Sequence, residues 1–148
     1  MVEVSGGDRL RDKLQGIARQ VTNASAVKIG FLAGATYPSG QNVAMIAAIN
    51  EFGAPSRGQP PRPFFRDMLA AKRGEWPKAM SDLLKDNDYD ALRTLQQTGE
   101  AVAGQLRESI TTFSGVPLKP ATIARKGFDK QLVDTGVMLG SVSYAVEA

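Results

Sequence analysis

The acidic run Asp86-Asn87-Asp88-Tyr89-Asp90 has the spacing in this sequence that comes nearest to a metal site. Carboxylates on alternate residues resemble the opening of a calcium-binding EF-hand loop. That loop needs glycine at its sixth position and a bidentate glutamate at its twelfth, where this chain has Ala91 and Gln97. Carboxylates also favour the positive end of a helix dipole. We therefore predict a capped, acid-rich helix start here and no metal site.

Other residue patterns that resemble catalytic groups have simpler interpretations. Ser25-Ala26-Val27-Lys28 matches a Ser-x-x-Lys string, but residues three apart in a strand face opposite sides, so the lysine could not activate the serine. Asp8 with Asp12, and Glu100 with Glu108, have the spacing of solvated carboxylates on a helix surface. The chain contains no histidine and no cysteine, which removes the usual general base and the thiolate nucleophile. We predict a protein that is not an enzyme and uses no cofactor.

Length and composition indicate one globular domain. The 148 residues, 43% of them hydrophobic, can form a core of ordinary size, so we assign residues 1–148 to a single domain. No apolar run approaches the roughly 18 residues that cross a bilayer, and the first residues do not resemble a signal peptide. We expect that the protein is synthesised in a cytoplasm and does not associate with a membrane.

Hydrophobic periodicity predicts the secondary structure at the two ends of the chain. Residues 1–24 form an N-terminal segment whose helix, over 8–22, begins at Asp8 as N-cap. Its apolar stripe consists of Leu10, Leu14, Ile17 and Val21. Strands are predicted at residues 26–32, with Val27, Ile29 and Phe31 on one face, and at the C-terminal end, where Val142, Tyr144 and Val146 alternate.

Between these strands the sequence is mainly helical. Residues 41–52 predict a short helix that is apolar nearly all round, and thus buried on several sides, ending at Gly53. Residues 63–85 predict one or two helices, and residues 88–113 a long one in which Gly99 and Gly104 allow close approach of another element. We predict an α+β fold, with a small, mainly antiparallel sheet packed on one long central helix, shorter helices and extended loops.

A Gly/Pro-rich arm over residues 53–66 ends in Phe64 and Phe65, with Arg62 and Arg66 on either side. Its prolines favour an extended, polyproline-like course rather than a helix or a central strand. Two adjacent aromatic rings must be buried somewhere. They pack either in their own domain or, as we favour for a long proline-rich loop, against another subunit.

Charge is unevenly distributed along the chain. The net charge is +3, but residues 53–78 carry +4, residues 117–130 carry +3 and residues 79–113 carry −3. The simplest interpretation is solvated surface. Alternatively, basic loops of one copy face acidic helices of the next, or these loops, including a basic region over 115–131, line a path for DNA.

Four segments, in this order, carry a family resemblance. They are Asn50-Glu51-Phe52-Gly53; Pro60-Pro61-Arg62-Pro63-Phe64-Phe65; Pro117-Leu118-Lys119-Pro120-Ala121-Thr122 with Arg125-Lys126-Gly127; and Leu132-Val133-Asp134-Thr135-Gly136 with Leu139, Ser141 and Val142. The set resembles the neck and tail-completion (virion morphogenesis) proteins of tailed bacteriophages and prophages. The resemblance spans about residues 27–146 and leaves out the N-terminal helix. Gly140 departs from it, since a polar residue commonly precedes that serine.

This resemblance implies a structural virion protein that joins the tail to the DNA-filled head, as a homo-oligomeric ring around the DNA channel, expected to be a hexamer. Its partners would be other copies of itself, neighbouring neck and tail-tube proteins, and DNA that passes through without sequence-specific binding. It would be located in the virion neck, and in the host cytoplasm during assembly. The expected inter-subunit contacts are Phe52, Arg62, Phe64, Phe65 and Arg66. The expected basic residues facing a partner or DNA are Arg57, Lys119, Arg125, Lys126 and Lys130, and the expected turn motif is Asp134, Thr135 and Gly136.

Two alternatives stay open at this stage. A tail terminator, which caps the tail tube, would share most of these features. A small basic nucleic-acid-binding protein would be recognised by an affinity that falls steeply with salt.

Overall fold

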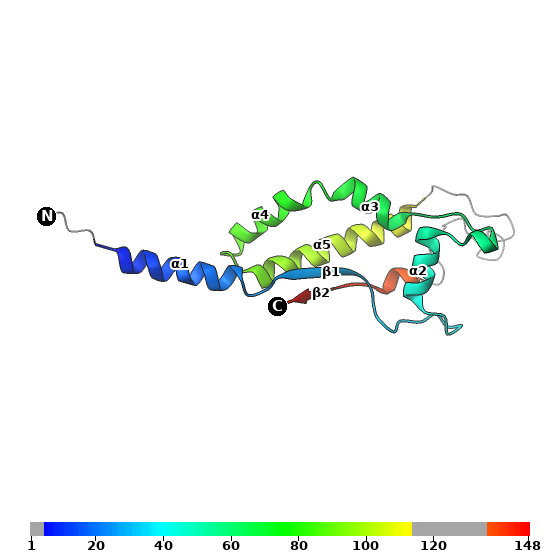
Figure 1. The fold of residues 1–148 in the computed structure, drawn as a ribbon, viewed down its shortest axis with the longest axis horizontal. Coiled ribbons are helices and arrows are strands. Elements are labelled where there is room, and N and C mark those ends of the chain that lie inside the picture. Colours follow the sequence, from blue (N-terminus) through cyan, green and yellow to red (C-terminus); the bar gives the residue numbers. More distant parts are fainter. Residues whose placement is uncertain (1–4, 114–135) are drawn as a thin grey trace.

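The computed structural model describes residues 5–113 and 136–148. Within them the chain adopts an α+β fold, as the sequence predicted. The long helix α5 (Ala91–Thr112) runs through the body between two layers, with β1 and β2 on one side and α3 and α4 on the other (Figure 1). Helix α2 lies at one end of the body, and α1 projects from the other end (Figure 1).

The sheet is a two-stranded antiparallel pair formed by the first and last strands of the described chain. Strand β1 (Ala26–Phe31) pairs with β2 (Val142–Glu147), with Phe31 opposite Val142 and Ala26 opposite Glu147. The predicted alternation is confirmed: the apolar residues of both strands pack into the core, whereas Lys28 is exposed. One apolar face with one polar face is how an antiparallel sheet covers a helix.

Helix α5 supplies the centre of the core, as its period of three or four residues predicted. Val102, Leu106 and Ile110 are buried on its inner face. Gly99 permits the predicted close approach, because a Cβ atom there would lie 2.5 Å from a ring carbon of Tyr144 on β2. Gly104 does not, since a Cβ atom there would meet no described atom within 4 Å. The prediction of close packing was therefore right for Gly99 and wrong for Gly104.

The predicted helical region 63–85 consists of two helices, α3 (Phe64–Lys72) and α4 (Trp76–Asp86). Pro77 lies in the first turn of α4, where a proline costs no hydrogen bond. Trp76 packs against the core of its own chain, and its indole N–H donates to Gln105 Oε1 at 2.9 Å. The turn at Trp76 thereby ties α4 to α5.

Helix α2 (Val43–Phe52) begins at Asn42, whose side chain accepts a hydrogen bond from the Met45 N–H, and ends at Gly53 as predicted. The prediction that it is buried on several sides was wrong. Its fully buried residues are Val43, Ala47 and Glu51, which form a single stripe, whereas Met45 and Phe52 are exposed. Within the described residues only one face of α2 meets the body, and an apolar face remains open.

Helix α1 (Gly7–Val21) lies almost entirely outside the body. Its N-cap is Gly6 in a left-handed conformation and not Asp8, which lies instead in the first turn. None of its residues is buried. At its base, Asn23 holds it to α5: Asn23 Oδ1 accepts from the Leu92 N–H at 2.7 Å, and Asn23 Nδ2 donates to Asp90 at 3.0 Å.

None of the helices within residues 5–113 and 136–148 has both the length and the apolar composition that a bilayer crossing requires.

Candidate assembly interface

The Gly/Pro arm folds back on α2 and does not extend away from the domain. Its turn is a 3-10 helix over Pro55–Arg57, and Ala54 pairs with Gln59 across it. The Gln59 side chain donates to Asn50 Oδ1, and the Arg62 N–H donates to the Asn50 carbonyl at 2.6 Å. The expectation of an extended, reaching arm is therefore corrected: hydrogen bonds to the end of α2 close it into a compact loop.

Gly53 makes this closure possible. Its φ is 77°, in the left-handed region that favours glycine. A Cβ atom on it would lie 2.8 Å from the Pro61 nitrogen and 2.9 Å from the Gln59 carbonyl oxygen. Only a residue without a side chain lets the two halves of the arm pass this close to the end of α2.

Glu51 joins the end of α2 to the start of α3. The residue is 6% exposed, and its carboxylate accepts hydrogen bonds from the Phe65 N–H at 2.9 Å and the Arg66 N–H at 3.1 Å. The first N–H groups of a helix have no partner within it, and Pro63, the N-cap of α3, provides no side-chain acceptor. Glu51 supplies that acceptor from 14 residues away.

Arg66 completes this arrangement with two further bonds to Glu51. Its Nε donates to the Glu51 carboxylate and its Nη2 donates to the Glu51 main-chain carbonyl, both at 2.8 Å. The same guanidinium lies over the ring of Phe52, 5.2 Å from the ring centre. We call these contacts of Glu51, Phe52 and Arg66 the clamp, since they fix the orientation of an aromatic ring that faces solvent.

The clamp presents Phe52 on the open face of α2. Phe52 is 65% exposed and Met45, two helical turns earlier on the same face, is 55% exposed. Ala48, which lies between them on that face, is also exposed. Aromatic residues, methionine and arginine are enriched in protein interfaces relative to the rest of the surface. This face, Met45, Ala48 and Phe52 with Arg66, is the candidate interface.

Phe64 is not part of that surface, which corrects the expectation that it contacts another subunit. It is 1% exposed, packs edge-on against Phe31 and belongs to the core of its own chain. Phe65 is half-buried and lies edge-on to Phe64. The two adjacent rings are anchors of α3 to the body, and the exposed aromatic ring is Phe52.

Arg62, the remaining predicted contact residue, is half-buried beside the arm. Burial lowers the pKa of its guanidinium from the usual value. Its Nε is buried without a hydrogen-bond acceptor among the described residues. Its place next to Asn50 makes it a structural part of the folded arm more than an outward contact.

The predicted basic and turn residues are only partly within the described ranges. Arg57 is exposed at the tip of the arm. Gly136 precedes the short helix α7 (Val137–Gly140) with φ of 75°, a backbone conformation suited to glycine. Gly140 is exposed and a Cβ atom on it would meet no described atom, so a polar residue would fit there. The predictions for Lys119, Arg125, Lys126, Lys130, Asp134 and Thr135 lie outside the described residues.

The acidic run forms a capped helix start, as predicted. Asp90 is the N-cap of α5 and accepts a hydrogen bond from the Arg93 N–H at 3.1 Å. Asp88 and Tyr89 turn the chain with φ of 54° and 64°. In residues 5–113 and 136–148, no three acidic side chains come close enough together to hold a metal ion.

Sequence reasoning placed Asn50 and Glu51 beside the arm but missed what the glutamate does. The available signal was a helix that starts at Pro63, a residue whose side chain cannot accept a hydrogen bond from the first helical N–H groups. A glutamate stands at the end of the preceding helix and can supply that acceptor. No protein-family model, curated protein or solved structure matches this chain.

Proposed function

We propose that this chain is a structural virion protein of a tailed phage or prophage. It acts as a tail-completion or neck component that joins the tail to the DNA-filled head as a ring of identical copies.

The observation that carries the proposal is that two separate segments of the family resemblance form one physical unit. Asn50-Glu51-Phe52-Gly53 and the segment that leads into Arg66 are joined through the buried Glu51 carboxylate. That carboxylate is satisfied within the unit, and what the unit presents outward is a fixed aromatic ring with a guanidinium over it. A set of residues that builds an outward-facing contact supports assembly rather than catalysis.

In the ring, the open face of α2 packs against a different surface of the next copy. Such a heterologous contact closes a ring when its rotation divides a full turn. Phe52 supplies apolar area at the centre of the contact, while Arg66 is already oriented by Glu51 and loses little side-chain freedom on binding. The body of β1, β2 and α5 forms the wall behind it.

The test deletes the gene for this chain from the phage that encodes it and then supplies the wild-type chain or a variant in trans. Without the chain, we expect filled heads and finished tails that do not join, seen by electron microscopy of the lysate. The wild-type chain restores joined particles, whereas Phe52→Asp does not. Leu32→Asp is the matched control, since Leu32 is 51% exposed outside α2 and outside the clamp.

Three results would contradict parts of this proposal. Complete, infectious particles in the absence of the chain would exclude a role in joining. Tails of unregulated length would indicate a terminator instead. Equal rescue by Phe52→Asp and wild type, with both folded, would remove the α2 face as the ring contact.

A further inference from the structure

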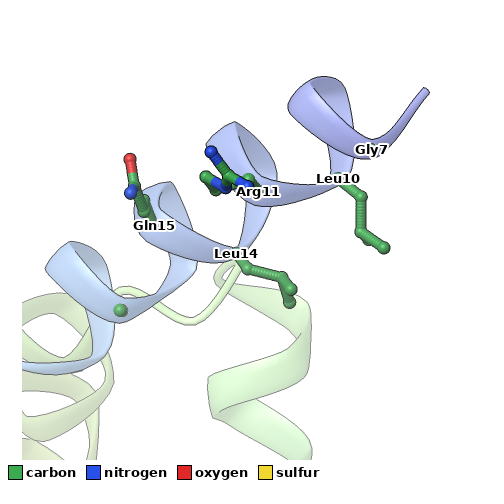
Figure 2. A pocket seen from close by; sticks show the side chains of 6 residues that line it. Gly7, Leu10, Arg11, Leu14 and Gln15 are labelled. Atoms are coloured by element: carbon green, nitrogen blue, oxygen red, sulfur yellow. The ribbon is translucent and has the colours of Figure 1, made fainter. Parts of the chain in front are cut away.

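Helix α1 carries an apolar stripe that the other described residues of the chain leave uncovered. Leu10 is 60% exposed and Leu14 is 56% exposed, with Ile17 half-buried and Val21 exposed toward the base. Figure 2 shows Leu10 and Leu14 on one side of α1 and Gln15 pointing away from them. The surface hollow along this helix is lined by residues of α1 itself (Figure 2). We call Leu10, Leu14, Ile17 and Val21 the seam.

The spacing of the seam indicates the kind of surface that covers it. Steps of four, three and four residues place all four side chains at the a and d positions of a heptad, the narrow stripe that packs against another helix. In this register Leu10 and Ile17 are d positions, and Leu14 and Val21 are a positions. A helix of 15 residues is marginal in isolation, so its stripe needs a packed partner.

A second copy of the same helix fits this stripe in an antiparallel orientation. Antiparallel coiled helices pair a with d positions, which sets Leu14 against Ile17 of the second copy and Leu10 against its Val21. The flanking Arg11 then faces Ala18 of the second copy, and Lys13 faces its Gln20. No like charges are opposed, so the pairing meets no electrostatic penalty along the seam.

The antiparallel orientation also brings opposite charges together. The outer half of α1 carries Arg9, Arg11 and Lys13 against Asp8 and Asp12, a net charge of +1, and it reaches the base of the second copy's α1. At that base Asn23 is bonded to Leu92 and Asp90, so the turn between α4 and α5 lies beside it. This turn presents the exposed Asp86 and Asp88 together with Tyr89 and Leu92, which are 38% and 40% exposed.

From this complementarity we propose that α1 is a dimerisation helix. Two copies of the chain pair through antiparallel α1 seams, and the basic tip of each α1 rests on the acidic, partly apolar α4–α5 turn of the other. The contact uses neither Phe52 nor Arg66, so it is independent of the ring proposed above.

Two other surfaces fit the seam less well. The open face of α2 in another copy is apolar, but Arg66 lies over Phe52 there and would repel the basic flanks of α1. An anionic membrane would suit a basic amphipathic helix. However, an anionic membrane would repel the carboxylates of Asp8 and Asp12, and it would give the acidic turn no binding partner.

The absence of cysteine from the whole chain allows a direct cross-linking test. We would prepare Leu10→Cys and Val21→Cys separately and treat each alone, and then the mixture, with a short bis-maleimide. The antiparallel pair predicts efficient dimers only in the mixture, because the two introduced thiols of a Leu10→Cys dimer would be about 16 Å apart along the helix axis. Equal cross-linking of each variant alone would overturn the antiparallel pairing, and no cross-linking in any sample would overturn the dimer.

Sedimentation equilibrium of the full chain gives the second readout. Leu14→Asp should weaken dimerisation by at least about tenfold, since it places a charge in the centre of the seam. Gln15→Asp adds the same charge on the opposite side and should leave dimerisation within about twofold of wild type. Raised salt should weaken the wild-type dimer.

Because no α1 residue is buried, both variants should keep the thermal unfolding midpoint of the wild type when all three proteins are measured as dilute monomers. Equal dimerisation by both variants would overturn the role of the seam. A wild-type chain that stays monomeric and instead binds anionic vesicles through α1 would overturn the dimer and assign the helix to a membrane.

Discussion

The α2–α3 clamp and helix α1 both leave large apolar side chains in solvent, but for different structural reasons. In the clamp, Phe52 is exposed while the residues on either side of it are fixed: Glu51 is buried and Gly53 is held against Pro61. In α1 no residue is buried, and the helix is attached to the body at its base. One region displays a single side chain from a rigid frame, and the other displays a whole helix.

This difference separates two ways in which a surface can be prepared for a partner. The clamp has already ordered Phe52 and Arg66, so a contact made there costs little further conformational entropy. Helix α1 has few contacts of its own, so a partner must supply the packing that stabilises it. Substitutions should therefore affect folding strongly in the first region and association mainly in the second.

The largest effect is expected from shortening one apolar side chain in the core behind the clamp and one on α1. Phe64→Ala should lower the free energy of unfolding by about 4 kcal/mol, because it empties a site that is 1% exposed. Leu14→Ala, measured on dilute monomer, should change it by less than about 0.5 kcal/mol. Urea unfolding followed by circular dichroism measures both. A loss of similar size for Leu14→Ala would mean that α1 packs on its own body.

An intermediate effect is expected from the buried carboxylate of the clamp. Glu51→Ala should cost about 2 to 3 kcal/mol of unfolding free energy, since it leaves the Phe65 and Arg66 N–H groups without their acceptor. Glu51→Gln, which keeps one acceptor oxygen but no charge, should cost less. Glu108→Ala, an exposed carboxylate on α5, is the control and should change stability by less than about 0.5 kcal/mol.

The Glu51 variants also bear on the role in assembly that we propose for the clamp. If Glu51→Gln folds normally yet restores fewer joined particles than wild type, then the orientation of Arg66 over Phe52 matters for assembly. If Glu51→Gln restores joined particles fully, the carboxylate contributes to folding alone. The fixed orientation of Arg66 over Phe52 would then have no part in assembly.

The smallest effect is expected at the base of α1, where Asp90 and Asn23 meet. The Asn23 side chain and the Arg93 N–H hold the pKa of the Asp90 carboxyl below its usual range. A carboxyl whose pKa is lower in the folded state stabilises the fold above its unfolded pKa, and this contribution is lost as pH falls through the folded pKa. Thermal unfolding below about pH 4 should therefore lower the midpoint more for wild type than for Asp90→Asn. An equal decline in both proteins would exclude this contact as the acid-sensitive one.

Elements with strong local signals could be predicted from the sequence. Helix α5 follows from apolar residues that repeat every three or four positions, and the end of α2 follows from Gly53. The strands follow from alternation in Val27–Phe31 and Val142–Val146, and the structure pairs them across almost the whole chain. Local hydrogen bonding and side-chain sterics set these elements, so a short stretch of sequence contains the information.

The candidate interface could be predicted only in part. Sequence reasoning selected the correct segment, since Phe52 and Arg66 were both expected to be contact residues. It also selected Phe64, which the fold buries, and it treated the arm as extended. Phe52, Phe64 and Phe65 are chemically identical, and only the path of the chain decides which ring meets the core.

Local sequence patterns were sufficient to predict an α+β fold with a long central helix, an amphipathic N-terminal helix and a Gly/Pro arm bounded by aromatic and basic residues. The tertiary structure decided that the arm folds back, that Glu51 caps a helix 14 residues away, and that Phe52 rather than Phe64 faces outward. The physical reason is that helix and strand formation depend mainly on neighbours along the chain. Burial and long-range hydrogen bonds depend instead on which distant segments the fold brings together.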